Sequence, residues 1–198
     1  MKQAKVLTDK ELRRVLAVAD TMRHGGRNRL AVHLSHLAGL RVGEIAHLKV
    51  GDVLTEDGAA RDRLHINPSY AKGGKGRTVF INAKLAKEIE KYVRGLSTLS
   101  EPKCKRMLDP QSPLIASQKR RHFSPNSLCQ LFGEIYALAG IETSSHAGRR
   151  FFITRLALSG VSAKVIMELA GHSQLTTTQR YIDVNDDMKR EAVEILCS

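Results

Sequence analysis

Residues 146–181 read HAGRRFFITRLALSGVSAKVIMELAGHSQLTTTQRY, and the glycines of this stretch divide it into short helices. A first helix is expected from about Ala147 to Ser159, because Gly160 supplies a stop. Ser162 is a favoured helix N-cap, and the helix that it begins ends at Gly171. A third helical segment is expected near residues 176–182. The stretch therefore predicts short helices joined by tight turns.

The same stretch gathers side chains suited to chemistry on a phosphate. His146 and Arg149 lie three residues apart at the start of a helix and therefore share one face. His172 directly follows a helix-ending glycine, and Tyr181 lies nine residues further on. An arginine fork suits a phosphate, and a phenol can attack one when fixed cations surround it. Each residue alone is typical of a solvated or packed surface. Only the ordered set indicates chemistry on a phosphate.

Further cations lie far upstream of this stretch. Arg41 stands in the sequence GLRVGE, residues 39–44, at the start of a short helix expected over 42–48. Strands are expected over 64–66 and 78–81, joined by the glycine-rich sequence AKGGKGR at 71–77. This hairpin tip carries Lys72, Lys75 and Arg77, and it therefore predicts a positively charged finger.

Helices are expected over most of the remaining chain. Thr8 and Glu11 form a capping box for a first helix that runs to about Met22, where Gly25 and Gly26 break it. Further helices are expected over about 28–38, 85–95, 125–140 and 186–197. Residues 97–113 are expected to be an exposed connection. The chain is therefore predicted to be mainly α with a small antiparallel β-sheet, an α+β fold in the looser sense.

The composition favours a soluble protein that binds nucleic acid. The 198 residues carry a net charge of +12, which attracts polyanions. The positive charge is spread along the chain, and this disfavours a basic amphipathic helix on a membrane surface. No apolar run approaches the roughly 20 residues that span a bilayer, and the N-terminus lacks the apolar core of a secretory signal. We therefore expect a cytoplasmic protein without a membrane partner.

No cysteine or histidine pattern indicates a metal. The three cysteines, Cys104, Cys129 and Cys197, are odd in number and far apart, so they form neither a disulfide framework nor a metal knuckle. His33 and His36 lie one turn apart on an expected helix, but the sequence offers no evident third ligand.

Five motifs together resemble the tyrosine recombinases, also called the phage integrase family. GLRVGEIAHL at 39–48, followed by GDV at 51–53, resembles the first-arginine motif of that family. KGGKGR at 72–77 is similar to its hairpin lysine loop, and HAGR at 146–149 matches its His-x-x-Arg box. LAGHS at 169–173 and TTQRY at 177–181 resemble its Gly-His and nucleophile segments. The likeness runs from about Thr8 onward and implies the fold of a tyrosine recombinase catalytic domain.

The resemblance implies a site-specific DNA recombinase that integrates, excises or inverts DNA. Tyr181 would attack the scissile phosphate, leaving a 3′-phosphotyrosyl link and a free 5′-hydroxyl. Arg41 and Arg149 would hold the non-bridging oxygens, and Lys72 would be the general acid. The remaining implied roles are His146 and His172 for orienting the phosphate or handling protons, and Glu44 for holding Arg41. Neither ATP nor a metal is required, because the ester conserves the bond energy.

The expected partner is a double-stranded DNA recombination site. The cations expected to contact it are Lys75, Arg77, Arg150 and Arg180. We also expect the protein to form a homo-oligomer, a tetramer, on DNA and to be a monomer free in solution. It is expected to associate with the nucleoid. Too few residues precede Thr8 for the helical core-binding domain of many family members. Residues 1–198 are therefore expected to be a single catalytic domain, either excised or naturally alone.

Two other functions stay open from the sequence. A type IB topoisomerase shares the chemistry but relaxes supercoils without exchanging partners. A non-catalytic DNA-binding regulator could place residues 162–182 as a helix-turn-helix-like unit. The regulator gives no reason for Arg41, Lys72 and the nine-residue gap from His172 to Tyr181 to occur together.

Overall fold

A computed structural model describes residues 4–70, 76–97, 109–181 and 193. Its helix α1 (Asp9–Thr21) begins with the predicted capping box. The Glu11 amide donates to Thr8 Oγ1 at 3.2 Å, and the Thr8 amide donates to Glu11 Oε2 at 2.9 Å. This local exchange satisfies two amides that the helix itself leaves unpaired.

Helix α2 (Gly25–Leu37) begins earlier than predicted. The expected break at Gly25 and Gly26 is wrong, because both glycines lie in the first turn of α2. The chain reverses instead at His24, whose φ of 64° is left-handed. A Cβ on Gly25 would lie 2.0 Å from the Asp20 carbonyl oxygen, so glycine permits the close approach of the two helices.

The middle of the chain forms the predicted hairpin between short helices. Helix α3 (Val42–His47) is followed by α4 (Val50–Val53), a single turn too short to show helical periodicity in the sequence. Strands β1 (Arg63–Ile66) and β2 (Arg77–Phe80) then pair antiparallel, with the 3-10 helix η1 (Pro68–Tyr70) after β1. The predicted strands are therefore confirmed, and the loop at 71–75 lies outside the described residues.

The remaining helices follow the predicted order. They are α5 (Ala83–Ser97), α7 (Pro125–Leu138), α8 (Ala147–Leu158), α9 (Ala163–Ala170) and α10 (Leu175–Gln179). Ser124 and Ser162 cap α7 and α9 through their hydroxyls, as predicted. The expected helix over 186–197 lies outside the described residues except for residue 193.

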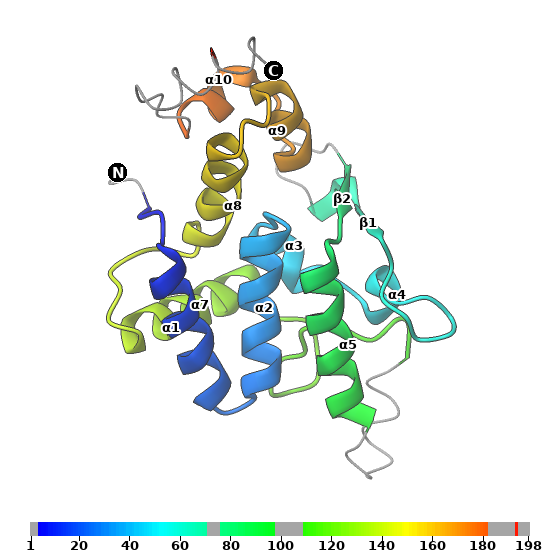
Figure 1. The fold of residues 1–198 in the computed structure, drawn as a ribbon. Helices are drawn as coiled ribbons and strands as arrows, with labels where there is room; N and C mark the ends of the chain where they lie inside the picture. The colour runs from blue at the N-terminus through cyan, green and yellow to red at the C-terminus, as the bar shows by residue number, and fades with distance from the viewer. Residues whose placement is uncertain (1–3, 71–75, 98–108, 182–192, 194–198) are drawn as a thin grey trace.

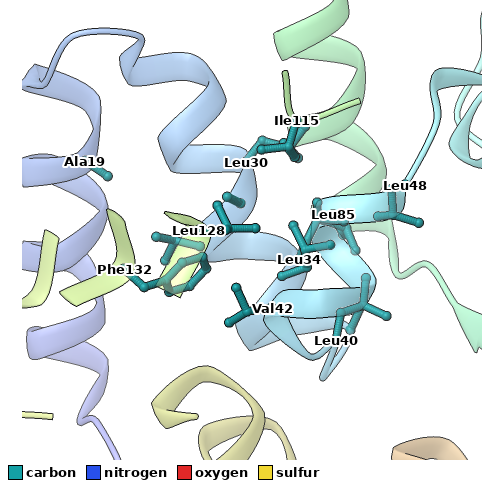
Figure 2. Close-up of a cluster of buried hydrophobic side chains, with 14 of the residues drawn as sticks. Ala19, Leu30, Leu34, Leu40, Val42, Leu48, Leu85, Ile115, Leu128 and Phe132 are labelled. Carbon is teal, nitrogen blue, oxygen red and sulfur yellow. The ribbon is translucent and has the colours of Figure 1, made fainter. Parts of the chain in front are cut away.

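The core has two parts, and the smaller one positions the functional end of the molecule. The larger part packs side chains of α1, α2, α3, α5 and α7, among them Leu34 and Phe132 (Figure 2). The smaller part joins α8 to α9 through Ile153 and Ile166, and Tyr181 packs against it. Figure 1 shows α8, α9 and α10 at one end of the molecule, with α9 beside the hairpin.

The predicted fold class is confirmed: the described chain is mainly helical with one two-stranded antiparallel sheet. Within those described ranges, no helix has both the length and the apolar character needed to cross a membrane.

Candidate active site

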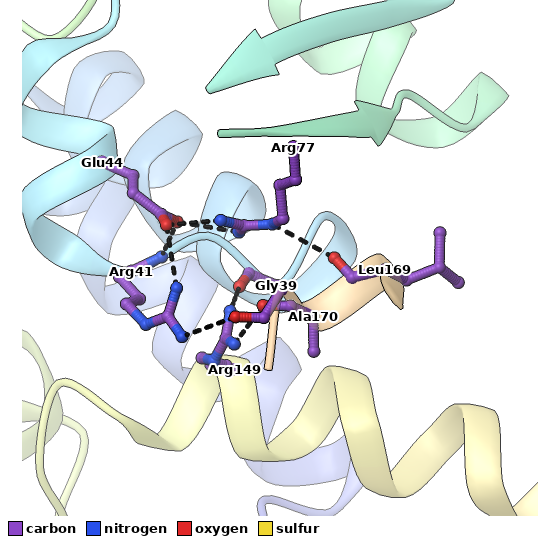
Figure 3. A network of polar contacts seen from close by, with 8 residues as sticks. Gly39, Arg41, Glu44, Arg77, Arg149, Leu169 and Ala170 are labelled. Carbon is purple, nitrogen blue, oxygen red and sulfur yellow. Dashed lines mark hydrogen bonds and ion pairs between the residues drawn. The ribbon is translucent and has the colours of Figure 1, made fainter. Parts of the chain in front are cut away.

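A buried carboxylate lies at the base of the site. Glu44, on α3, has a side chain that is 0% exposed, and it accepts from the Arg41 amide at 2.8 Å and from Arg41 Nη1 at 3.0 Å. Arg41 Nη2 also donates to the Gly171 carbonyl at 3.4 Å. Glu44 therefore holds Arg41 at the N-terminus of α3 and directs it toward the turn after α9 (Figure 3).

Arg77 is a second cation on the same carboxylate. Its Nη2 donates to Glu44 Oε2 at 2.9 Å, and its Nε donates to the Leu169 carbonyl at 3.2 Å. The side chain is only 7% exposed. The predicted DNA contact by Arg77 stays a prediction, while the structure places its guanidinium on the buried carboxylate. The structure favours Arg77 as a support that ties the hairpin to α3 and α9.

Arg149 is buried, and no carboxylate in the part of the chain that the structure describes forms an ion pair with it. The residue is 5% exposed, and its guanidinium donates to the carbonyls of Gly39, at 2.8 Å, and of Ala170. Burial lowers the pKa of Arg149 to about 9, and the nearby Arg41 and Arg77 act in the same direction while Glu44 and Tyr181 oppose them. Among the described residues, Glu44 pairs with Arg41 and Arg77, and Arg149 lies near them without an ion pair of its own, so this part of the site carries excess positive charge that suits an anion.

His172 and Tyr181 border this cationic cluster. Burial lowers the pKa of His172 to about 4, and repulsion from Arg149, Arg41 and Arg77 adds to the effect. The imidazole is therefore neutral near pH 7. Its ring stacks on the Tyr181 ring, with centroids 5.8 Å apart, and its Nδ1 lies 2.8 Å from Thr178 Oγ1.

Not every predicted site residue joins this cluster. His146 occupies the N-cap position of α8 and is exposed, and Arg180 is exposed at the end of α10. The half-buried Arg150 lies with its guanidinium carbon 5.7 Å from the centroid of the Tyr181 ring. Lys72 and Lys75 lie outside the described residues.

The histidine pair considered as a metal site is part of the interior. His33 and His36 are both buried on α2, and burial lowers the pKa of each to about 4. In the part of the chain that the structure describes, no group of three potential ligands comes together.

Gly39 supplies one of the two carbonyls that hold Arg149, and its backbone excludes other residues. Its φ is +63°, and a Cβ there would lie 2.5 Å from Phe152 Cδ1. We expect backbone strain in Gly39→Ala to lower the free energy of unfolding by about 1–2 kcal/mol. The displacement of Phe152 is expected to add to this loss.

Urea denaturation measures this effect. Gly140→Ala is the matched control, because Gly140 has a φ of +65° but a Cβ there would meet nothing within 4 Å. Equal losses of stability in the two variants would contradict the proposed clash with Phe152.

Comparisons with known proteins identify the family and the fold. The sequence model of the phage integrase family matches residues 5–188. Tyrosine recombinase XerA of Pyrococcus horikoshii is 34% identical over 194 residues, which cover 96% of this chain and 60% of that protein. The chain thus spans about three fifths of the length of this curated relative.

Solved structures show the same fold. The crystal structure of XerA recombinase superposes with a TM-score of 0.72 at 23% identity, covering 96% of this chain and 65% of that one. XerH recombinase, bound to its difH substrate before cleavage, gives a TM-score of 0.71 at 25% identity, covering 98% and 55%. The expected likeness to a recombinase catalytic domain is confirmed for the fold.

Proposed function

Because this chain belongs to the phage integrase family, we propose that it cuts and rejoins double-stranded DNA at specific sites through a 3′-phosphotyrosyl intermediate. The observation that carries this proposal is the cationic cluster beside Tyr181, built from segments far apart in the sequence. Arg41 and Arg149 converge there, and among the described residues Glu44 is the carboxylate that acts on both of them. A phosphodiester supplies the missing negative charge.

In the proposed reaction, Tyr181 Oη gives up its proton and bonds to phosphorus, while the bond from phosphorus to the 5′ oxygen breaks and that oxygen takes up a proton to become a hydroxyl. Arg41 and Arg149 hold the non-bridging oxygens, and Lys72 donates a proton to the 5′ oxygen. His146 and His172 orient the phosphate or handle protons. Each preorganised donor contributes roughly 3–4 kcal/mol to the transition state. The 5′-hydroxyl of a partner strand reverses the step, so the ester retains the energy of the broken bond.

We further propose that the protein acts on DNA of the nucleoid, as a tetramer on its site and as a monomer off it. The net charge of +12 supports the DNA partner. Sedimentation velocity with and without a bound duplex measures the assembly, and a single protomer per site at saturation would contradict the tetramer.

A covalent-trapping experiment on DNA of random sequence tests the proposed function. The probe is a pool of nicked duplex oligonucleotides with randomised arms, from which complexes that resist denaturation are selected. We expect an adduct on a narrow subset of sequences. An adduct accompanied only by relaxation of supercoiled plasmid indicates a topoisomerase, and absence of any adduct despite DNA binding indicates a regulator.

Substitutions of Arg180 and of Arg77 are expected to have different effects on DNA binding. Arg180 is exposed, whereas the guanidinium of Arg77 is committed to Glu44. Arg180→Gln is therefore expected to reduce the slope of log K against log salt concentration by about one, the effect of losing one phosphate contact.

Fluorescence anisotropy on random-sequence duplex DNA measures this slope. Arg77→Gln, compared over the temperatures at which it is folded, is expected to keep the slope of the unmodified chain. A reduced slope in Arg77→Gln would show that Arg77 contacts DNA.

A further inference from the structure

Thr178 contacts both His172 and Tyr181. It is the last of three consecutive threonines. Thr178 is the buried residue of α10, with 0% exposure. Its Oγ1 lies 2.8 Å from His172 Nδ1, and its carbonyl accepts from the Tyr181 amide at 2.9 Å. One residue thus fixes the position of two proposed members of the active site.

The direction of the hydrogen bond between Thr178 and His172 follows from burial. A buried hydroxyl needs an acceptor for its hydrogen, because an unsatisfied donor costs about 1–3 kcal/mol. The hydrogen bond that the described residues give Thr178 Oγ1 is the one with His172 Nδ1, at 2.8 Å. If Nδ1 carried the hydrogen and donated it, the hydroxyl hydrogen of Thr178 would be left without an acceptor among the described residues. This favours Thr178 as the donor and Nδ1 as the acceptor.

We propose that Thr178 is a positioning residue that holds His172 as the tautomer protonated at Nε2, so that the imidazole offers the scissile phosphate a hydrogen-bond donor. This inference rests on the proposed function. A neutral imidazole has one N–H and one lone pair, so a lone pair engaged at Nδ1 leaves the N–H at Nε2. The low pKa of His172, caused first by burial and then by the surrounding arginines, keeps the ring neutral near pH 7.

The tautomer decides which task the imidazole performs. An N–H at Nε2 stabilises negative charge on a phosphate oxygen, as an oxyanion donor does. The same nitrogen has no lone pair with which to accept the proton of the Tyr181 phenol. The contact with Thr178 thus assigns His172 to stabilising the phosphate and not to activating the nucleophile.

Nitrogen-15 NMR of the full chain tests the tautomer directly, with a His172→Gln variant to assign the signals. At pH 7 we expect an unprotonated Nδ1 and a protonated Nε2 in His172. A protonated Nδ1 would overturn the proposal. This readout needs no DNA, so it is independent of whether the chain forms an adduct and separates the failure of this inference from the failure of the proposed function.

Substitutions of Thr178 provide the second readout. Thr178→Val keeps the shape and removes the hydroxyl, and we expect a mixture of tautomers and an adduct that forms about tenfold more slowly. Thr178→Ser restores the hydroxyl and is expected to recover most of the rate and the tautomer. The exposed Thr176 gives the control, since Thr176→Val should change neither.

Two results would contradict the proposal at this stage: an unchanged rate in Thr178→Val, or a Thr178→Ser variant as slow as the valine variant. If Thr178→Val does not fold, the spectrum of the unmodified chain still decides the direction of the hydrogen bond.

Discussion

Tyr181→Phe is expected to abolish the covalent DNA adduct while leaving folding and DNA affinity nearly unchanged. The substitution removes only the phenolic oxygen, which is the atom proposed to bond to phosphorus. The ring itself packs against the small core of α8 and α9 and stacks on His172, and phenylalanine keeps both contacts. Tyr181 is half-buried, so the stability should change by no more than about 0.5 kcal/mol.

Denaturing gels of the selected nicked duplex measure the adduct, and anisotropy measures the affinity. The matched control is Tyr70→Phe, which makes the same change in an exposed tyrosine of η1. The control should form the adduct. An adduct that persists in Tyr181→Phe would show that another residue is the nucleophile.

Local sequence signals predict the framework of this fold well. The capping box of Thr8 and Glu11 and the Ser124-Pro125 start of α7 are interactions within a few residues, so the chain specifies them without the rest of the fold. The turn before α2 is misplaced by one to two residues because the close approach of Gly25 to Asp20 depends on how two helices pack. Glycine marks both a break and a tight contact, and the sequence alone does not separate them.

The sequence predicts which residues form the proposed site but not which of them contact one another. Arg41, Arg149, His172 and Tyr181 stand in motifs, and the structure brings them to one cluster. The commitment of Arg77 to Glu44 joins residues 33 positions apart and depends on where β2 meets α3. The contact of Thr178 with His172 spans only six residues, yet it depends on the turn between α9 and α10. Adjacent threonines at 176 and 177 carry the same sequence signal, so composition does not single out residue 178.

Glu44→Gln is expected to destabilise the protein by about 3–5 kcal/mol, because it leaves two guanidinium groups without their shared carboxylate in a buried setting. Burial alone would raise the pKa of Glu44, but the hydrogen bonds and charges of Arg77 and Arg41 outweigh it and lower the pKa. A carboxyl with a lowered pKa in the folded state stabilises the fold above its ordinary pKa. That contribution is lost as the pH falls through the lowered value.

Urea denaturation between neutral and acidic pH measures both effects. The stability difference between the unmodified chain and Glu44→Gln should be largest near pH 7 and should narrow on acidification. Glu168→Gln is the control, because Glu168 is exposed and its pair with Lys164, at 3.6 Å, contributes little. A Glu44→Gln variant as stable as the control at pH 7 would show that the carboxylate is not needed to hold the arginines.

A double substitution separates the effect of charge from that of packing. Unpaired positive charge could be the main cause of the lower stability of Glu44→Gln. In that case, removing Arg77 as well should recover part of the stability, because one guanidinium no longer lies buried without a counter-ion. If lost packing dominates, the two losses should add. The first result would mean that Arg77 is tolerated only because Glu44 is present, and that the carboxylate sets how much positive charge remains for a phosphate.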